Sequence, residues 1–340
     1  MKRVRGFFVG ALILMVLVCS FTACSNTSQD AVAPPDENTA EEIQSDNEEV
    51  SIIEIGDVQG DMVPLENSPA IATVLSPTAS GTDVRKNDKA EIDVSNMKDG
   101  YIMIRYSAGG TANLKVLVTG PSKTAYTYNL KKDGSHEVFP LSDGNGSYSV
   151  GVYKNISGTK YSTEFTTSFS VALTDEFAPF LRPNQYVNFN ANTLAVKKAA
   201  ELAAGQTTAL GKVQKVYDYV IKNFTYDTQL AATVQSGYLP NLDTVWNKKS
   251  GICFDYAATM AAMLRSQGIP TKLVIGYTGN AYHAWINVYT QDAGWIENVI
   301  YFDGKTWKLM DPTFASSAKS SESIMKYIGD GKNYAAKYLY

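Results

Sequence analysis

The stretch GICFDYAATMAAMLRSQGIP, residues 251–270, decides the fold of the C-terminal half of the chain. Alanine, methionine and leucine are good helix formers, and Gly268 followed by Pro270 is typical of a helix C-terminus. Cys253 therefore lies at the N-terminal end of the predicted helix, where free amides and the helix dipole favour a thiolate over a thiol. The small residues predict a helix that packs closely against other elements, and Gly251 permits a close backbone approach beside the cysteine.

The residues after this helix predict antiparallel strands that carry a histidine and an aspartate. KLVIGY predicts a buried strand, TGNA a turn, and HAWINVY a second strand with His283 at its start. Residues 298–310 predict a hairpin, and Asp311 follows it directly. Neighbouring antiparallel strands can place His283 beside Asp311, with the N-terminal end of the helix lying across them.

These three residue types suit nucleophilic catalysis. A thiol nucleophile needs a base that holds it as a thiolate, and the base needs an acceptor that orients it. Taken singly, Cys253 would more simply be a small core residue, His283 a half-buried strand residue, and Asp311 a turn acid before proline. Together, in this order of elements, they predict a Cys-His-Asp catalytic triad.

The 340-residue chain contains three cysteines, and the N-terminus accounts for two of them. Residues 1–24 combine basic residues, an unbroken apolar run and a small residue before Cys24, which is typical of a secretory signal. The segment resembles a bacterial lipoprotein signal, in which Cys24 would carry the lipid, although Phe21 departs from the usual aliphatic residue. Plain secretion is the alternative. Because Cys19 would leave with the signal, Cys253 is the only free thiol expected, kept either as an inert core residue or as a reactive one.

We expect four segments along the chain, of which residues 1–24 are the lipoprotein signal peptide. Residues 25–77 are rich in Asp and Glu and predict a disordered stalk, since such a segment cannot bury enough apolar surface to order itself. Residues 78–176 show short alternating apolar and polar runs separated by turn signals such as KKDGS and SDGNGS, which predicts an all-β sandwich. Residues 177–340 form the C-terminal α+β domain and begin with an amphipathic helix that ends near Asn223.

The sequence gives weaker signals for other partners, for bound metals or cofactors, and for further site residues. The net charge is −4, so nothing favours a nucleic-acid partner. Two distant histidines and one thiol do not make a zinc site, and no cofactor is expected. The backbone N–H of Cys253 is a natural oxyanion donor, with Tyr226 or Trp246 as a side-chain donor. Asp255 and Trp285 lie beside triad residues and are expected to cap and to pack rather than to react.

The segments GICFDYA, LRSQGIP, GY, YHAW and WKLMDPT occur in this order, and together they resemble the transglutaminase-like superfamily of papain-type cysteine enzymes. The resemblance covers residues 206–317, under half the chain. It implies an α+β fold in which the cysteine helix packs on an antiparallel sheet or barrel. It also implies that Cys253 is the nucleophile, His283 the base and Asp311 the residue that orients the base. The stretch TQDAGWIENVIYFDG is longer than the family's pattern, which leaves the local strand pairing open.

From these residues we expect an enzyme, anchored to the outer face of the cell membrane, that transfers acyl groups from amide bonds through a thioester on Cys253. Hydrolysis by a peptidase or amidase is favoured, with a surface protein or a cell-wall peptide as substrate, and a protein cross-linking transglutaminase is the alternative. The alternative from another class is a surface binding protein, in which the C-terminal domain is catalytically silent and the β-sandwich binds the partner. A third alternative is an adhesin whose Cys253 bonds to a partner once and permanently.

Overall fold

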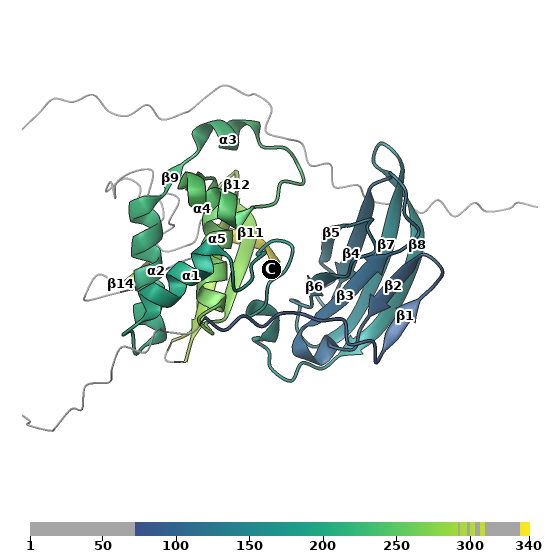
Figure 1. The fold of residues 1–340 in the computed structure, drawn as a ribbon, viewed down its shortest axis with the longest axis horizontal. Helices are drawn as coiled ribbons and strands as arrows, with labels where there is room; N and C mark the ends of the chain where they lie inside the picture. The colour runs from purple at the N-terminus through teal and green to yellow at the C-terminus, as the bar shows by residue number, and fades with distance from the viewer. Residues whose placement is uncertain (1–71, 292, 298–299, 303–306, 310–333) are drawn as a thin grey trace, which may run out of the picture. The chain divides into compact units, whose positions relative to one another are not determined.

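The computed structural model describes residues 72–291, 293–297, 300–302, 307–309 and 334–340. The predicted signal peptide, Cys24, Asp311 and most of the predicted stalk therefore lie outside the described residues. From residue 67 onward the chain forms one compact unit. Strands come first along the described chain, and helices with a second set of strands follow (Figure 1).

Residues 84–171 form two antiparallel four-stranded sheets. One sheet has the order β1 (Val84–Lys86), β2 (Ala90–Asp93), β3 (Tyr101–Tyr106) and β6 (Glu137–Pro140), and the other has the order β5 (Ala125–Leu130), β4 (Leu114–Thr119), β7 (Gly146–Ser157) and β8 (Lys160–Val171). In β4 the buried side chains alternate with partly exposed ones, because successive residues of a strand point to opposite faces. The rings of Tyr128 in β5 and Phe139 in β6 lie 5.2 Å apart, so the inner faces of the two sheets pack together. The predicted all-β sandwich is confirmed.

Helices of the second half enclose one long buried helix. The chain runs through α1 (Leu194–Ala203), α2 (Ala209–Asn223), α3 (Thr228–Thr233), α4 (Leu242–Lys248) and α5 (Cys253–Arg265). The helix predicted to end near Asn223 is α2, whose N-terminus is capped by the Thr208 hydroxyl, which accepts a hydrogen bond from the Gly211 N–H at 3.0 Å. The sequence 251–270 forms α5 followed by a turn, in which Gly268 adopts a φ of +73°.

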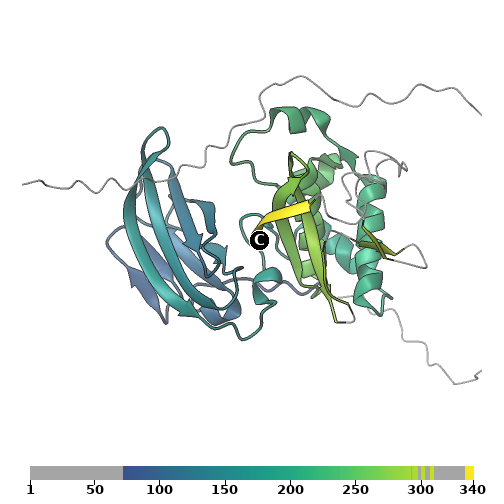
Figure 2. The same ribbon diagram turned by 180° about the vertical axis from the view of Figure 1, so that it is seen from behind.

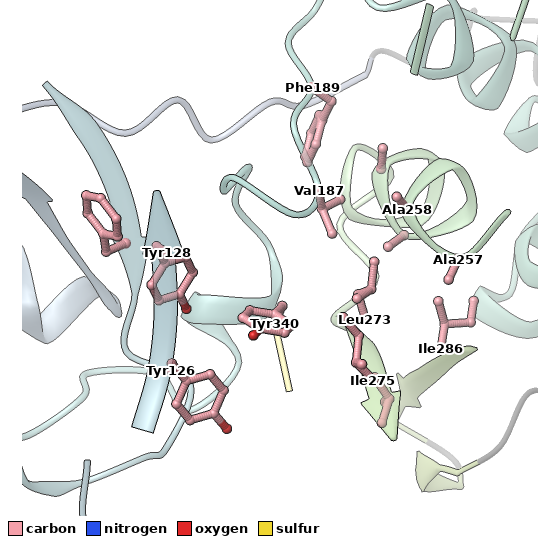
Figure 3. Packing of buried hydrophobic residues seen from close by; sticks show 14 of the residues in the cluster. Tyr126, Tyr128, Val187, Phe189, Ala257, Ala258, Leu273, Ile275, Ile286 and Tyr340 are labelled. Carbon is pink, nitrogen blue, oxygen red and sulfur yellow. The ribbon is translucent and has the colours of Figure 1, made fainter. Parts of the chain in front are cut away.

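The long helix α5 packs against an antiparallel sheet. That sheet has the order β13 (Gly294–Ile296), β12 (Ala281–Thr290), β11 (Thr271–Thr278) and β16 (Tyr334–Leu339). Figure 3 shows the contact, in which Ala257 and Ala258 of α5 lie over Leu273, Ile275 and Ile286 of the sheet. Alanines on the helix allow this close approach, as the sequence predicts, and the predicted helix-borne cysteine on an antiparallel sheet is confirmed.

Strand pairing differs from expectation at one place. The C-terminal strand β16 joins the sheet beside β11, which the sequence analysis did not predict (Figure 2). The predicted hairpin is confirmed, because β14 (Ile300–Phe302) pairs antiparallel with β15 (Trp307–Leu309). Among the described strands the neighbours of β12 are β11 and β13, and β13 pairs with Val288–Thr290 at the end of β12 away from His283. Asp311 lies outside the described residues, so its place beside His283 stays a prediction.

The end of the predicted stalk range lies against the C-terminal domain. Ala72 and Val74 pack on the hydrophobic core, and the Thr73 N–H donates a hydrogen bond to the Ser266 carbonyl at the end of α5. In the described part of the chain, none of the helices combines the length and the apolar character needed to cross a bilayer.

Candidate active site

Cys253 is the first residue of α5 and is partly exposed. It follows Ile252, whose extended backbone marks the start of the helix. The rest of α5 is buried from Asp255 to Arg265, so packing on all sides holds the helix in place while its first residue remains accessible. A thiol in this position lies beside backbone amides of the first helical turn, which have no acceptor within the helix.

Asp255 caps the N-terminus of α5. Its fully buried carboxylate accepts hydrogen bonds from the Ile252 N–H at 2.8 Å and from the Tyr238 hydroxyl at 2.7 Å. Burial raises the pKa of Asp255 above its usual range, and the two hydrogen bonds oppose that shift. The loop that carries Tyr238 is therefore tied to the helix end that carries Cys253.

Gly251 packs directly under the Asp255 side chain. A Cβ at Gly251 would lie 2.6 Å from the Asp255 Cβ, so a larger residue would displace the cap. The short strand β10 (Ser250–Gly251) pairs in parallel with β9 (Thr225–Tyr226), with Gly251 opposite Tyr226. This pairing places the backbone of Tyr226, one of the two predicted oxyanion donors, beside the segment that enters α5.

Trp246, the other predicted oxyanion donor, takes part in an aromatic stack. Its ring lies parallel to Tyr219 at 5.5 Å, and the Lys249 ammonium lies 3.3 Å from its centroid. Lys249 has a φ of +52°, which ends α4 and turns the chain toward β10. The structure thus places Trp246 in a packing role between α2 and α4.

His283 lies near the start of β12 and is 7% exposed. It is opposite Gly276 of β11, and a Cβ at Gly276 would meet Trp285 Cη2 at 2.9 Å and the backbone oxygen of Ala335. Glycine is therefore required at this position for β16 and Trp285 to pack beside His283. Trp285 is 1% exposed and its ring lies 5.1 Å from that of Tyr334.

Cys253 and His283 come from elements that pack together, α5 and β12. Tyr282, directly before His283, is 46% exposed. Burial raises the pKa of Tyr282 above its usual range. Asp311 lies outside the described residues, so the structure places two of the three predicted triad residues.

Sequence reasoning missed Tyr238 and Tyr282. Tyr238 lies in a loop without periodicity, and no local pattern marks it as the partner of Asp255. Tyr282 does have a signal, because it precedes His283 in a predicted strand and alternation places it on the opposite face. Within the described residues there is no group of three or more His, Cys, Asp or Glu side chains that could hold a metal ion.

A scan of family models matches residues 196–299 to the "Transglutaminase-like superfamily". These residues resemble a transglutaminase-like domain. The match includes α5 with Cys253 and β12 with His283, so the two described triad candidates lie inside it. It ends before Asp311.

The relatives of this transglutaminase-like domain are much longer proteins. YebA of Bacillus subtilis is 31% identical over 124 residues, which cover 31% of this chain and 16% of YebA. A protein-glutamine gamma-glutamyltransferase of Pseudomonas aeruginosa is 32% identical over 68 residues, which cover 16% of this chain and 10% of that protein. Among solved structures, the periplasmic domain of TgpA from Pseudomonas aeruginosa bound to ethylmercury is 17% identical, with 73% of this chain and 80% of that chain covered at a TM-score of 0.30.

Proposed function

We propose that this protein is a cysteine-dependent enzyme that transfers acyl groups from amide bonds outside the cytoplasm. Cys253 is the nucleophile, His283 the base and Asp311 the residue that orients His283. The position of Cys253 carries the proposal: a partly exposed thiol begins a buried helix, inside a transglutaminase-like domain. The apolar segment that ends at Ala23 and Cys24 supports export and lipid anchoring, with secretion as the alternative.

The chemistry follows from these roles. The Cys253 Sγ attacks the carbonyl carbon of an amide as His283 takes the thiol proton, and backbone amides at the start of α5 stabilise the oxyanion. When the C–N bond breaks, His283 returns its proton to the departing amine, and a thioester remains on Cys253. Water then attacks the thioester and transfers a proton through His283 to the leaving sulfur, which releases a carboxylic acid and restores the thiol.

The acyl acceptor distinguishes two candidate activities. Hydrolysis makes the protein a peptidase or amidase that acts on a surface protein or a cell-wall peptide, and this is the activity we favour. The relative named protein-glutamine gamma-glutamyltransferase supports the second candidate, in which an amine replaces water and two proteins become cross-linked. The alternative from another class of protein is a surface binding protein, in which the C-terminal domain is catalytically silent and the β-sandwich binds the partner.

The pH dependence of Cys253 alkylation tests the proposed site without a known substrate. In the chain with Cys19→Ser and Cys24→Ser, Cys253 is the single thiol. We expect iodoacetamide to alkylate Cys253 faster than free cysteine at pH 7, because a catalytic thiol needs a base beside it. His283→Ala should slow this reaction and change its pH dependence, because the base that takes the thiol proton is lost.

His136 provides the matched control, since it is the other histidine of the chain and bonds to Glu91 in the sandwich at 3.0 Å. His136→Ala should leave the alkylation profile unchanged. If Cys253 in the parent chain reacts as free cysteine does, and His283→Ala changes neither the rate nor its pH dependence, the proposed nucleophile is excluded and the catalytically silent domain is favoured. With glutamine-containing proteins and a labelled primary amine, incorporation of the amine identifies transfer and new amino termini identify hydrolysis. Cys253→Ala should abolish either reaction.

A further inference from the structure

A polar cavity of about 370 Å³ lies between the β-sandwich and the loop that joins α3 to α4. Its volume is within the range of about 300–1,000 Å³ that is usual for ligand sites. The sandwich supplies most of the lining and the loop supplies two residues. The lining residues are Asn113, Leu114, Lys115, Asn129, Leu130, Lys132, Tyr161, Ser236 and Gly237.

The cavity carries positive charge. Lys115 is partly buried in β4, and its ammonium donates a hydrogen bond to the Asn129 side-chain oxygen at 2.6 Å. Lys132 donates to the Thr111 carbonyl at 2.8 Å. Burial lowers the pKa of Lys115, which means that its charge is incompletely compensated by the surrounding protein.

No carboxylate offsets these two charges in the described part of the chain. The cavity lining contains no Asp or Glu, and neither Lys115 nor Lys132 has an ion pair with a described residue. Glu137 accepts a hydrogen bond from the Lys131 N–H and does not line the cavity. Two ammonium groups with neutral amide and hydroxyl neighbours suit an anion that also accepts hydrogen bonds.

The sandwich side of the cavity is held by hydrogen bonds. The Asn129 N–H and carbonyl bond to the Gln185 side chain at 2.9 and 3.0 Å. Gln185 belongs to the segment that leads from the sandwich into the transglutaminase-like domain. These paired hydrogen bonds fix the end of β5 that lines the cavity, so the cavity is a feature of the folded chain.

The loop side of the cavity leads to the candidate active site. Gly237 turns the loop with a φ of +89°, and the next residue is Tyr238. Tyr238 donates to Asp255, which caps the helix that begins with Cys253. The loop that lines one side of the cavity is therefore tied by hydrogen bonds to the helix end that carries Cys253.

We propose that this cavity binds a side-chain carboxylate of an acidic peptide, and that such a peptide is the substrate class of Cys253. Lys115 and Lys132 neutralise the carboxylate, while Asn113, Asn129 and Tyr161 surround it with polar groups. The assignment of the peptide as substrate rests on the proposed function, whereas the binding itself does not require catalysis.

Direct binding tests the proposal. The full chain with Cys253→Ala is titrated with a tetraglutamate peptide with blocked ends, at an ionic strength of about 50 mM, where exposed charges are weakly screened. We expect tetraglutamate to bind and the equally long tetraglutamine peptide to bind at least about tenfold more weakly. Lys115→Gln and Lys132→Gln should each weaken tetraglutamate binding about tenfold, the loss expected for one charged hydrogen bond.

Lys123 supplies the control, because it is an exposed lysine at the turn between the same two strands, β4 and β5. Lys123→Gln removes the same charge and should leave the affinity unchanged. If Lys115→Gln and Lys123→Gln weaken tetraglutamate binding equally, with unaltered melting temperatures, long-range charge attraction and not this cavity would account for the binding. That result would overturn the proposed site. Free glutamate that binds as tightly as the peptide would overturn the peptide assignment. If tetraglutamate does not bind to the Cys253→Ala chain, while alkylation of Cys253 in the parent chain still depends on His283, this inference is rejected and the proposed enzyme stands.

Discussion

At the scale of single residues, Asp255 is the side chain that holds the N-terminal end of α5, where Cys253 lies. It is fully buried, yet it accepts hydrogen bonds from the Ile252 N–H and from the Tyr238 hydroxyl. Removing it would leave two buried donors without a partner, and each such loss costs about 1–3 kcal/mol. An asparagine could keep both contacts, with its oxygen accepting from Ile252 and its amide donating to Tyr238.

Because the pKa of Asp255 is raised, the difference in unfolding free energy between the parent chain and Asp255→Asn should depend on pH. The folded state holds this proton more tightly than the unfolded state, whose carboxyl has the ordinary value of 3.8. The resulting stabilisation is complete below pH 3.8 and is lost as the pH rises through the raised value. Urea unfolding of both chains between about pH 3 and 7 should therefore show the parent losing stability relative to Asp255→Asn with rising pH. A constant difference across this range would show that burial does not raise the pKa.

At the scale of elements, Arg265 joins the end of α5 to three other segments. Its guanidinium is 1% exposed and donates four hydrogen bonds, all to backbone carbonyls: two to Thr271 at 2.9 and 2.7 Å, one to Arg182 at 2.7 Å and one to Tyr340 at 2.5 Å. Burial lowers its pKa to about 9. A planar group with five donors can reach several carbonyls at once, which explains why arginine is present at this position.

Arg265→Lys should destabilise the protein by about 3 kcal/mol or more. An ammonium on a flexible stem cannot reach all three carbonyls, and each lost hydrogen bond to a charged group costs about 1.5–3 kcal/mol. Chemical unfolding measures the loss. Arg85→Lys is the control, because Arg85 makes a partly exposed pair with Asp83 and its replacement should cost less than about 1 kcal/mol. If Arg265→Lys and Arg85→Lys lower the free energy of unfolding by similar amounts, the hydrogen bonds from Arg265 to the carbonyls do not account for its stabilising effect.

At the scale of the whole molecule, tyrosines connect the sandwich to the transglutaminase-like domain. Tyr340 lies edge-on to Tyr126 and Tyr128 of β5, as Figure 3 shows. Tyr186 stacks on Tyr340 with ring centroids 3.8 Å apart and donates its hydroxyl proton to the Thr127 carbonyl at 3.1 Å. Tyr186 also lies 5.7 Å from Phe254, the residue after Cys253. The sandwich and the transglutaminase-like domain therefore share one continuous core.

This shared core predicts one cooperative unfolding transition for the sandwich and the transglutaminase-like domain. Tyr186→Ala should separate it into two transitions in calorimetry, because Tyr186 is a partly buried aromatic side chain at the contact between them, and deleting a fully buried one costs about 3–5 kcal/mol. Tyr219→Ala removes a tyrosine that packs on Trp246 within the C-terminal domain, and it should lower the melting temperature without splitting the transition. Two transitions in the unaltered chain would contradict the shared core.

Much of the local structure could be predicted because its causes lie within a few residues. Alanine-rich composition and Gly268 delimit α5, and alternating side chains mark the strands of the sandwich. The predicted place of Asp311 beside His283 stays a prediction, because Asp311 lies outside the described residues and β13 pairs only with the far end of β12. Nothing local distinguishes Tyr226 from Trp246 as an oxyanion donor; the structure adds that Trp246 stacks on Tyr219 and that Tyr226 lies opposite Gly251, and the choice between them stays open.

The sequence by itself determined that a cysteine begins a tightly packed helix, that a histidine begins a strand after it, and that a β-sandwich precedes both. Helix propensity, capping and alternation act over short distances along the chain, so they are visible in the residues. Only the tertiary structure decided that Tyr238 bonds to Asp255, that Arg265 contacts carbonyls in three segments, and that two lysines line a cavity next to the Ser236 loop. These contacts join residues that are distant in sequence, and they form only because burial of the shared core brings their segments together.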